Sequence, residues 1–187
     1  MIKKSIFGKI ALVVVGALII PTLAVAQIKM GIILGFTGPI ESLTPDMGKS
    51  AELAFKEVSD SGQLLGGQKV SVVRADSTCI DAAAATTAAE RLITSDRVAG
   101  IMGADCSGVT TAIANNVAVP NGVAMISPSA TSPALSTIAD NGYFFRTAPS
   151  DARQGQVLAE ITIERGINNV AVTYINNDYG KGLSDSF

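Results

Sequence analysis

Apolar residues follow two alternating patterns along the chain: short runs, and longer segments in which they recur every three or four positions. Short apolar runs bounded by turn residues predict buried β-strands, and the wider spacing predicts helices. The predicted strands lie at residues 30–34, 70–73, 98–102, 123–126 and 143–145. Strands that alternate with helices at this spacing predict an α/β fold with a doubly wound, mostly parallel sheet.

Three helices are predicted between these strands. Thr44 is the expected N-cap of the first helix, Asp81 caps the second, which reaches about Thr94, and Ser107 opens the third, which reaches about Val117. Their expected inner faces are, in order, Met47, Ala51, Ala54, Phe55 and Val58; Ala85, Ala89, Leu92 and Ile93; and Val109, Ile113 and Val117.

The pattern restarts after Arg146. Ser150 and Asp151 open a fourth helix with Val157, Leu158 and Ile161 inward, and Gly166 ends it. A buried strand is predicted at residues 170–174, with a further helical start at Lys181. One helix and one strand cannot cover both faces of a sheet. We therefore predict a first lobe at residues 27–147 and the start of an incomplete second lobe at residues 148–187.

Residues 1–26 have the pattern of a cleaved signal peptide. Lys3, Lys4 and Lys9 precede an apolar segment at residues 10–20, and Ala24-Val25-Ala26 gives a small-x-small cleavage site. The alternative is a membrane anchor, but residues 10–26 are at the lower limit of a spanning length and Pro21 interrupts them. Gln27 stands where a lipidated protein has cysteine. We expect a soluble protein exported to the periplasm.

The charge and composition narrow the class of function. Removing the three leader lysines from the chain's 14 basic and 16 acidic residues leaves a net charge of −5. This charge and the small number of aromatic residues argue against nucleic acid as a partner. The chain contains no histidine, and G-x-S-x-G, G-x-G-x-x-G and P-loop motifs are all absent. We expect no enzyme activity, no cofactor and no metal site.

In an exported protein, Cys79 and Cys106 predict a disulfide, with two buried free thiols as the alternative.

Three loops leave the carboxyl ends of strands on one side of the predicted sheet, where open α/β sheets bind ligands. They are residues 35–39, 103–110 and 127–133. Ser107 stands at the start of a helix, where a hydroxyl and free N–H groups suit a carboxylate, although a simple helix cap is the alternative. The third loop, S-P-S-A-T-S-P, presents hydroxyls, and an ordinary surface loop is its alternative.

An ordered set of motifs resembles the type I periplasmic solute-binding proteins of ABC transporters, near the leucine/isoleucine/valine-binding group. The motifs are Gly38-Pro39, the Cys79 and Cys106 pair, Cys106-Ser107, Ile126 to Pro133, Phe145-Arg146-Thr147, Arg153-Gln154-Gly155 and Asp178 to Gly182. The resemblance covers residues 28–187. It implies two α/β lobes that close over an amino acid and deliver it to an inner-membrane permease, and we expect a monomer.

The resemblance also implies a ligand site. Ser107 and Thr131 would hold the α-carboxylate through hydroxyl and backbone N–H groups, and the Ser129 carbonyl would accept from the α-ammonium. Ala130 belongs to the same predicted site. Tyr179 would reach the ligand from the second lobe, with an ordinary tyrosine at a strand end as the alternative.

Two departures from the family pattern leave the ligand open. Residues 40–44 stand where an aromatic residue often lines the side-chain pocket, and Asp105 replaces a residue that is more often uncharged. A carboxylate there repels a ligand carboxylate unless it points away. The acidic partner of the ammonium is expected beyond Phe187. The competing functions are a sensory ectodomain and a binder of an amide, urea or an aromatic acid.

Overall fold

A computed structural model describes residues 27–187, so the predicted signal peptide lies outside the described residues. The strands are β1 (Ile28–Leu34), β2 (Val70–Asp76), β3 (Gly100–Gly103), β4 (Ala124–Ser127) and β5 (Phe144–Arg146). The α-helices are α1 (Thr44–Ser61), α2 (Ala82–Thr94), α3 (Ser107–Ile113), α4 (Asp151–Glu164) and α5 (Asp178–Ser186). Shorter helical turns are η1 (Leu64–Gly66), η2 (Ala114–Ala118) and η3 (Pro133–Ser136), of which η2 is a π-helical turn that continues α3.

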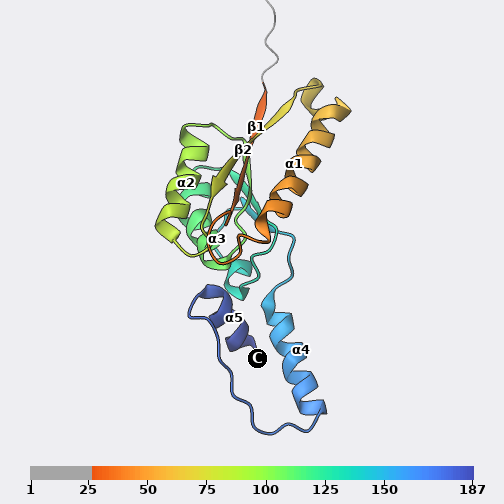
Figure 1. Ribbon diagram of the computed structural model, residues 1–187, viewed down its shortest axis with the longest axis vertical. Coiled ribbons are helices and arrows are strands. Elements are labelled where there is room, and N and C mark those ends of the chain that lie inside the picture. Colours follow the sequence, from red (N-terminus) through yellow and green to blue (C-terminus); the bar gives the residue numbers. More distant parts are fainter. Residues whose placement is uncertain (1–26) are drawn as a thin grey trace, which may run out of the picture.

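The five strands form one parallel sheet in the order β2-β1-β3-β4-β5, which confirms the predicted α/β class and the strand positions in the first lobe. Helix α1 covers one face of the sheet, and α2 and α3 cover the other (Figure 1). The chain winds outward in opposite directions from β1 and β3. The loops after these two strands therefore diverge and open a crevice at their carboxyl ends.

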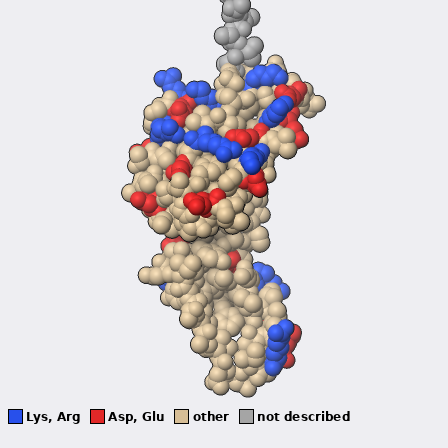
Figure 2. Space-filling model, in the orientation of Figure 1, with Lys and Arg blue, Asp and Glu red and all other residues tan. Residues whose placement is uncertain are grey.

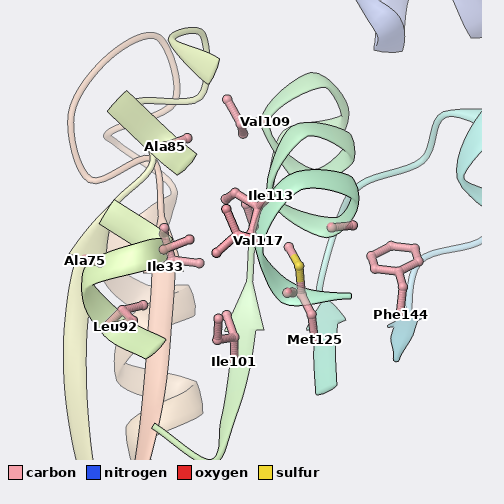
Figure 3. Packing of buried hydrophobic residues seen from close by; sticks show 14 of the residues in the cluster. Ile33, Ala75, Ala85, Leu92, Ile101, Val109, Ile113, Val117, Met125 and Phe144 are labelled. Carbon is pink, nitrogen blue, oxygen red and sulfur yellow. The ribbon is translucent and has the colours of Figure 1, made fainter. Parts of the chain in front are cut away.

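The core of the first lobe lies between the sheet and helices α2 and α3 (Figure 3). Ile33, Ile101 and Met125 project from three neighbouring strands and are buried against Leu92 of α2 and Ile113 of α3. The predicted inner faces of α2 and α3 are thus confirmed, and the Asp81 carboxylate caps α2 by accepting from the backbone N–H groups of Ala83 and Ala84.

Helix α1 differs from its prediction at its start and along its inner face. Leu43 is the N-cap, while the Thr44 hydroxyl is buried and donates to the Gly35 carbonyl at 2.9 Å. Gly48 is buried as well, whereas the predicted inner residues Ala54 and Val58 are exposed. Helix α1 comes close to the loop after β1 at Gly48, because a Cβ there would lie 3.1 Å from the Phe36 ring.

The predicted strand at residues 170–174 is wrong, because this segment is extended but unpaired and its apolar side chains are exposed. A strand needs a neighbour to bond its backbone N–H and C=O groups, and no strand within residues 27–187 lies beside it. On α4, Leu158 and Ile161 are exposed, contrary to expectation. Helix α4 instead packs on α5, where Gly155 meets the backbone of Ser186. Among the described helices, none is both long and apolar enough to cross a membrane.

Candidate functional site

A cavity of about 1020 Å³ lies between the loops of the first lobe and the beginning of the second. Its apolar lining comes from the loop after β1 and the start of α2, and includes Pro39, Ile40, Leu43, Ile80 and Ala82. Its polar lining from the first lobe includes Asp105, Ser107, Ser129 and Thr131. Asp151 and Gln154 of α4 and residues 175–179 close the other side.

Ser107 is buried at the first residue of α3, and its hydroxyl accepts from the backbone N–H of Ser132 at 3.1 Å. The N-cap position is occupied by Cys106, without a side-chain capping bond. Ser107 is therefore no ordinary helix cap, and its hydroxyl links the loop after β3 to the loop after β4. Because the oxygen accepts from Ser132, the hydroxyl hydrogen remains available to a further acceptor.

Hydrogen bonds of the Ser127 hydroxyl hold the loop from Ser127 to Pro133 against the rest of the first lobe. The Ser127 hydroxyl donates to the Ala104 carbonyl and accepts from the backbone N–H of Ala130 at 3.0 Å. Ala130 is fully buried in the hydrophobic core and does not line the cavity. Its place in the predicted site is thus structural, since it lies between two residues that do line the cavity.

Arg146 fastens the same loop from the β5 side. Its guanidinium donates to the carbonyl oxygens of Ala130 at 3.2 Å and Ser132 at 2.8 Å, and to the Ser136 hydroxyl. The planar, multi-donor guanidinium suits several acceptors of fixed position. The backbone groups on either side of Thr131 are thereby held, which sets the orientation of the Thr131 peptide.

Thr131 is bonded twice to the first residue of α4. Its hydroxyl donates to the Asp151 carboxylate at 2.7 Å, and its carbonyl accepts from the Asp151 backbone N–H at 2.9 Å. Asp151 is only 2% exposed. It follows Ser150, whose hydroxyl caps α4 as predicted by accepting from the N–H of Ala152. The loop from Ser127 to Pro133 is therefore joined directly to the first residue of α4.

Asp105 lines the cavity, but its carboxylate is occupied by hydrogen bonds within the protein. Its carboxylate accepts from the backbone N–H groups of Gly35 at 2.7 Å and Cys106 at 2.9 Å. These bonds join the loops after β1 and β3. The predicted disulfide between Cys79 and Cys106, with a Cα–Cα distance of 5.2 Å, is confirmed, and it ties the start of α2 to the same place.

The loop after β1 is held by a further acid, Asp76 at the end of β2. Its carboxylate accepts from the Thr37 hydroxyl at 2.6 Å and from the backbone N–H of Thr78 at 2.8 Å. Partial burial acts to raise the pKa of Asp76, but the hydrogen bonds from Thr37 and from backbone N–H groups outweigh it and hold this pKa below its ordinary value.

Tyr179 lies in the first turn of α5 rather than at the end of a strand, because the Asn177 side chain caps the helix by accepting from the N–H of Gly180. It lines the cavity opposite the first lobe and remains partly exposed. The structure thus brings Ser107, Ser129, Thr131 and Tyr179 to one cavity, as predicted.

The sequence does not identify Asp151 and Gln154 as site residues, although Asp151 lies at a predicted helix start and Gln154 in a family motif. Only their position against the loop from Ser127 to Pro133 brings them to the cavity. The signal that could have found Asp151 is its place immediately after a helix cap at the lobe boundary.

The cavity is acidic in its charged residues. Asp105, Asp151 and Asp178 line it, and none of its lining residues is a lysine or an arginine. Figure 2 shows lysine and arginine side chains gathered on the first lobe, at the end where β1 begins, and on the flank of the second lobe. The waist between the lobes has few charged side chains in this view.

Comparison with known proteins gives a consistent family. The family described as receptor family ligand binding region matches residues 46–187. The Leu/Ile/Val-binding protein homolog 3 of Brucella melitensis is 32% identical over 165 residues, which are 88% of this chain and 44% of the relative. The chain thus spans about half the length of the curated relatives it matches.

Solved structures agree on the fold. A leucine binding protein from Thermotoga maritima has a TM-score of 0.71 at 28% identity, over 86% of this chain and 44% of that one. A solute-binding protein from Rhodopseudomonas palustris in complex with benzoate has a TM-score of 0.74, over 87% of this chain and 44% of that one, and its 23% identity shows the fold alone. The chain therefore belongs to the family described as receptor family ligand binding region, and it has the fold of the type I periplasmic binding proteins.

Proposed function

We propose that this protein is the substrate-binding component of an ABC importer, which captures a branched-chain or related amino acid and delivers it to a membrane permease. The observation that carries the proposal is the pattern of free and occupied hydrogen-bonding groups around Thr131. Relatives named Leu/Ile/Val-binding proteins support the ligand class. Binding drives closure of the lobes because the closed state contacts the ligand from both sides.

In the loop from Ser127 to Pro133, some backbone N–H and carbonyl groups are hydrogen-bonded within the protein and others are free. The N–H and carbonyl of Ala130 and of Ser132 are all bonded within the protein. By contrast, the Ser129 carbonyl and the Thr131 N–H have no partner among residues 27–187. A donor and an acceptor are therefore left free two residues apart, as an amino acid's carboxylate and ammonium require.

The Ser107 hydroxyl adds a second donor at the carboxylate end. Its oxygen already accepts from the Ser132 N–H, which leaves the hydroxyl hydrogen free to donate to a ligand. We assign the carboxylate to the Ser107 hydroxyl and the Thr131 N–H, and the ammonium to the Ser129 carbonyl. In this assignment Tyr179 covers the ligand from α5, and Ala130 makes no contact.

The apolar end of the cavity suits an aliphatic side chain. Leu43 and Ile80 are large aliphatic residues that are 62% and 72% exposed, and both face this cavity beside the disulfide. Burying such surface against a ligand side chain is favourable by about 25 cal/mol per Å². Aliphatic residues in place of an aromatic ring leave room for a branched side chain.

A thermal-shift screen of the full-length protein tests the proposal. The panel contains the twenty amino acids together with urea, short amides and aromatic acids. A ligand at about 1,000 times its Kd stabilises the folded state by roughly 4 kcal/mol, which raises the Tm by several degrees. A shift with leucine, isoleucine or valine supports the proposal, and a shift with aromatic acids alone contradicts it.

The site assignment is tested by Ser107→Ala, with Ser50→Ala as the matched control. Ser50 is exposed on α1 and its hydroxyl bonds its own helix. Losing a hydrogen bond to a charged group costs about 1.5–3 kcal/mol, so Ser107→Ala is expected to weaken binding by roughly 10- to 150-fold. Calorimetry gives both Kd values. Equal affinities in the two variants would move the carboxylate elsewhere.

A further inference from the structure

Asp105 is a buried carboxylate to which the proposed function assigns no role. It is 3% exposed, and none of the salt bridges among residues 27–187 includes it. A buried charge without a cation is costly unless hydrogen bonds compensate it. Three donors do so: the backbone N–H groups of Gly35 and Cys106 and, at 3.3 Å, the Ser77 hydroxyl. They belong to the loops after β1, β3 and β2, so one carboxylate joins three loops at the carboxyl edge of the sheet.

The two carboxylate oxygens of Asp105 have different partners. Oδ2 accepts from the Gly35 N–H at 2.7 Å, while Oδ1 accepts from the Cys106 N–H at 2.9 Å and from Ser77. A hydrogen bond to a charged acceptor is stronger than one between neutral groups. The bond to Gly35 therefore fixes the place where the chain leaves β1.

Gly35 is held through both of its backbone groups. Its N–H donates to Asp105, and its carbonyl accepts from the Thr44 hydroxyl at 2.9 Å. A Cβ on Gly35 would lie 3.2 Å from the Cβ of Cys79 and 3.3 Å from the Asp105 carboxylate, so any larger residue must displace one of them. Residues 39–43, which contribute to the apolar lining of the cavity, follow Gly35 in the same loop. The position of this apolar wall thus depends on Gly35.

We infer that Asp105 is a specificity-determining positioning residue, which sets the position of the apolar wall at residues 39–43 relative to the start of α3 and thereby favours ligands with a long aliphatic side chain. The inference rests on the proposed function and concerns the same cavity. Asp105 needs no contact with the ligand in this role, because it acts through Gly35. The Asp105 carbonyl also accepts from the Ser129 hydroxyl at 3.0 Å, which connects the wall to the loop after β4.

The two ends of an amino acid should respond differently when the link to Gly35 is lost. All amino acids share the carboxylate and the ammonium, and the loops proposed to bind them are also held by Ser107 and Arg146. Only a long side chain reaches the apolar wall. Leucine and alanine share the first part and differ in the second, so the ratio of their Kd values reports on the position of the wall.

The test compares these two Kd values in the full-length wild type and in Asp105→Asn, with alanine measured by competition against leucine. Asparagine keeps the shape and the backbone carbonyl but has one acceptor oxygen. That oxygen satisfies most donors at the Oδ1 position, which places the side-chain NH₂ group against the Gly35 N–H. The Asp76 bonds still attach the loop at Thr37, so the wall shifts without detaching.

The variant is expected to bind leucine about 10-fold more weakly and alanine less than about 3-fold more weakly. The preference for leucine therefore falls, which a uniform loss of stability would not cause. Amide exchange at Gly35, measured by NMR, is expected to become faster in the same variant, because its N–H has lost its acceptor.

Two control variants separate this effect from charge and from stability. Asp46→Asn removes an exposed acid of the first lobe that lies outside the cavity. Leu92→Ala destabilises the buried core away from this edge of the sheet. Both are expected to keep the wild-type preference for leucine. Thr44→Val removes the donor to the Gly35 carbonyl at nearly constant volume and is expected to lower the preference, which decides the matter if Asp105→Asn does not fold.

The outcomes separate the inference from the proposed function. A wild-type preference for leucine that Asp105→Asn and Thr44→Val leave intact, or equal weakening of both ligands, overturns the inference alone. A wild-type protein that binds alanine as tightly as leucine does the same. A wild-type protein that binds no amino acid overturns both.

Discussion

Residues 28–147 and residues 151–187 have similar patterns of apolar residues, but they differ in how completely these residues are buried and in whether their strands are paired. In residues 28–147 every predicted strand pairs and helices α2 and α3 bury their apolar faces. In residues 151–187 the two helices pack mainly on each other, and Val170, Val172 and Ile175 remain exposed. An apolar run predicts a strand only where a neighbouring strand exists to complete its hydrogen bonds.

The two parts also contribute differently to the cavity. The first lobe supplies a fixed surface, because each ligand-facing loop is bonded to at least one other loop. The second part supplies Tyr179 and Asp151 from helix starts that touch the first lobe at few points. We therefore expect mutations in the buried core of the first part to change global stability, and mutations in the second part to change binding or local motion.

The largest expected contrast is between two apolar truncations. Leu92→Ala removes a fully buried side chain from α2 and is expected to lower the free energy of unfolding by about 2–5 kcal/mol. Ile163→Ala on α4 removes one that is 75% exposed and is expected to change it by less than about 0.5 kcal/mol. Urea denaturation measures both. Equal losses would show that α4 is buried in solution as deeply as α2.

The disulfide gives the next contrast, since both cysteines belong to the first part. Replacing Cys79 and Cys106 together with serine opens a loop with a sequence separation of 27 residues. The chain-entropy estimate for such a loop is about 3–4 kcal/mol. Hydrogen exchange should show the loss across β1 to β5 and leave α4 and α5 unchanged. Faster exchange confined to α4 and α5 would contradict this division.

Helix caps offer a smaller and closely matched test. Asp81 caps α2 and Asn177 caps α5, each through a side-chain oxygen that accepts backbone N–H groups. Replacing either with alanine costs about 0.5–2 kcal/mol. For Asp81→Ala the cost should appear in global unfolding, and for Asn177→Ala only as faster hydrogen exchange in α5 and weaker ligand binding. A full global loss in Asn177→Ala would mean that α5 unfolds together with the sheet.

The smallest expected effect is on acid stability and comes from Asp76. Its pKa is lower in the folded protein than its ordinary value of 3.8. The resulting stabilisation is present above that value and is lost as the pH falls through the folded pKa. Thermal melts below about pH 4 should therefore show a steeper loss in the wild type than in Asp76→Asn. Parallel curves would mean that the Thr37 bonds do not favour the charged form.

Most of the fold could be predicted because its signals are local. Short apolar runs locate all five strands, and the Asp81 and Ser150 caps locate the starts of two helices. The prediction was wrong where a distant contact decides the outcome. Thr44 looks like a cap by itself, but the Gly35 carbonyl takes its hydroxyl. The stretch at 170–174 looks like a strand, but a partner elsewhere in the chain is needed to make it one.

The candidate site shows the same limit. Hydroxyl-bearing residues at the ends of strands point to Ser107, Ser129 and Thr131, and the structure brings all three to one cavity. Whether a hydroxyl donates or accepts depends on its third partner, which sequence spacing does not reveal. The bond from Thr131 to Asp151 spans 20 positions and crosses the lobe boundary, so only the three-dimensional structure could assign it.

The place of β1 in the sheet has a consequence for how the protein is made. β1 emerges first during synthesis but occupies an interior position, with Ile28 beside Val70 and Met30 beside Gly100. The strands that pair with its two edges are synthesised 42 and 70 residues later. Parallel pairings of such sequence separation form slowly. Until residue 103 has been made, β1 is an unsatisfied apolar strand. Chaperones that hold nascent chains open should therefore recognise the segment from Ile28 to Leu34 before any other part of the first lobe.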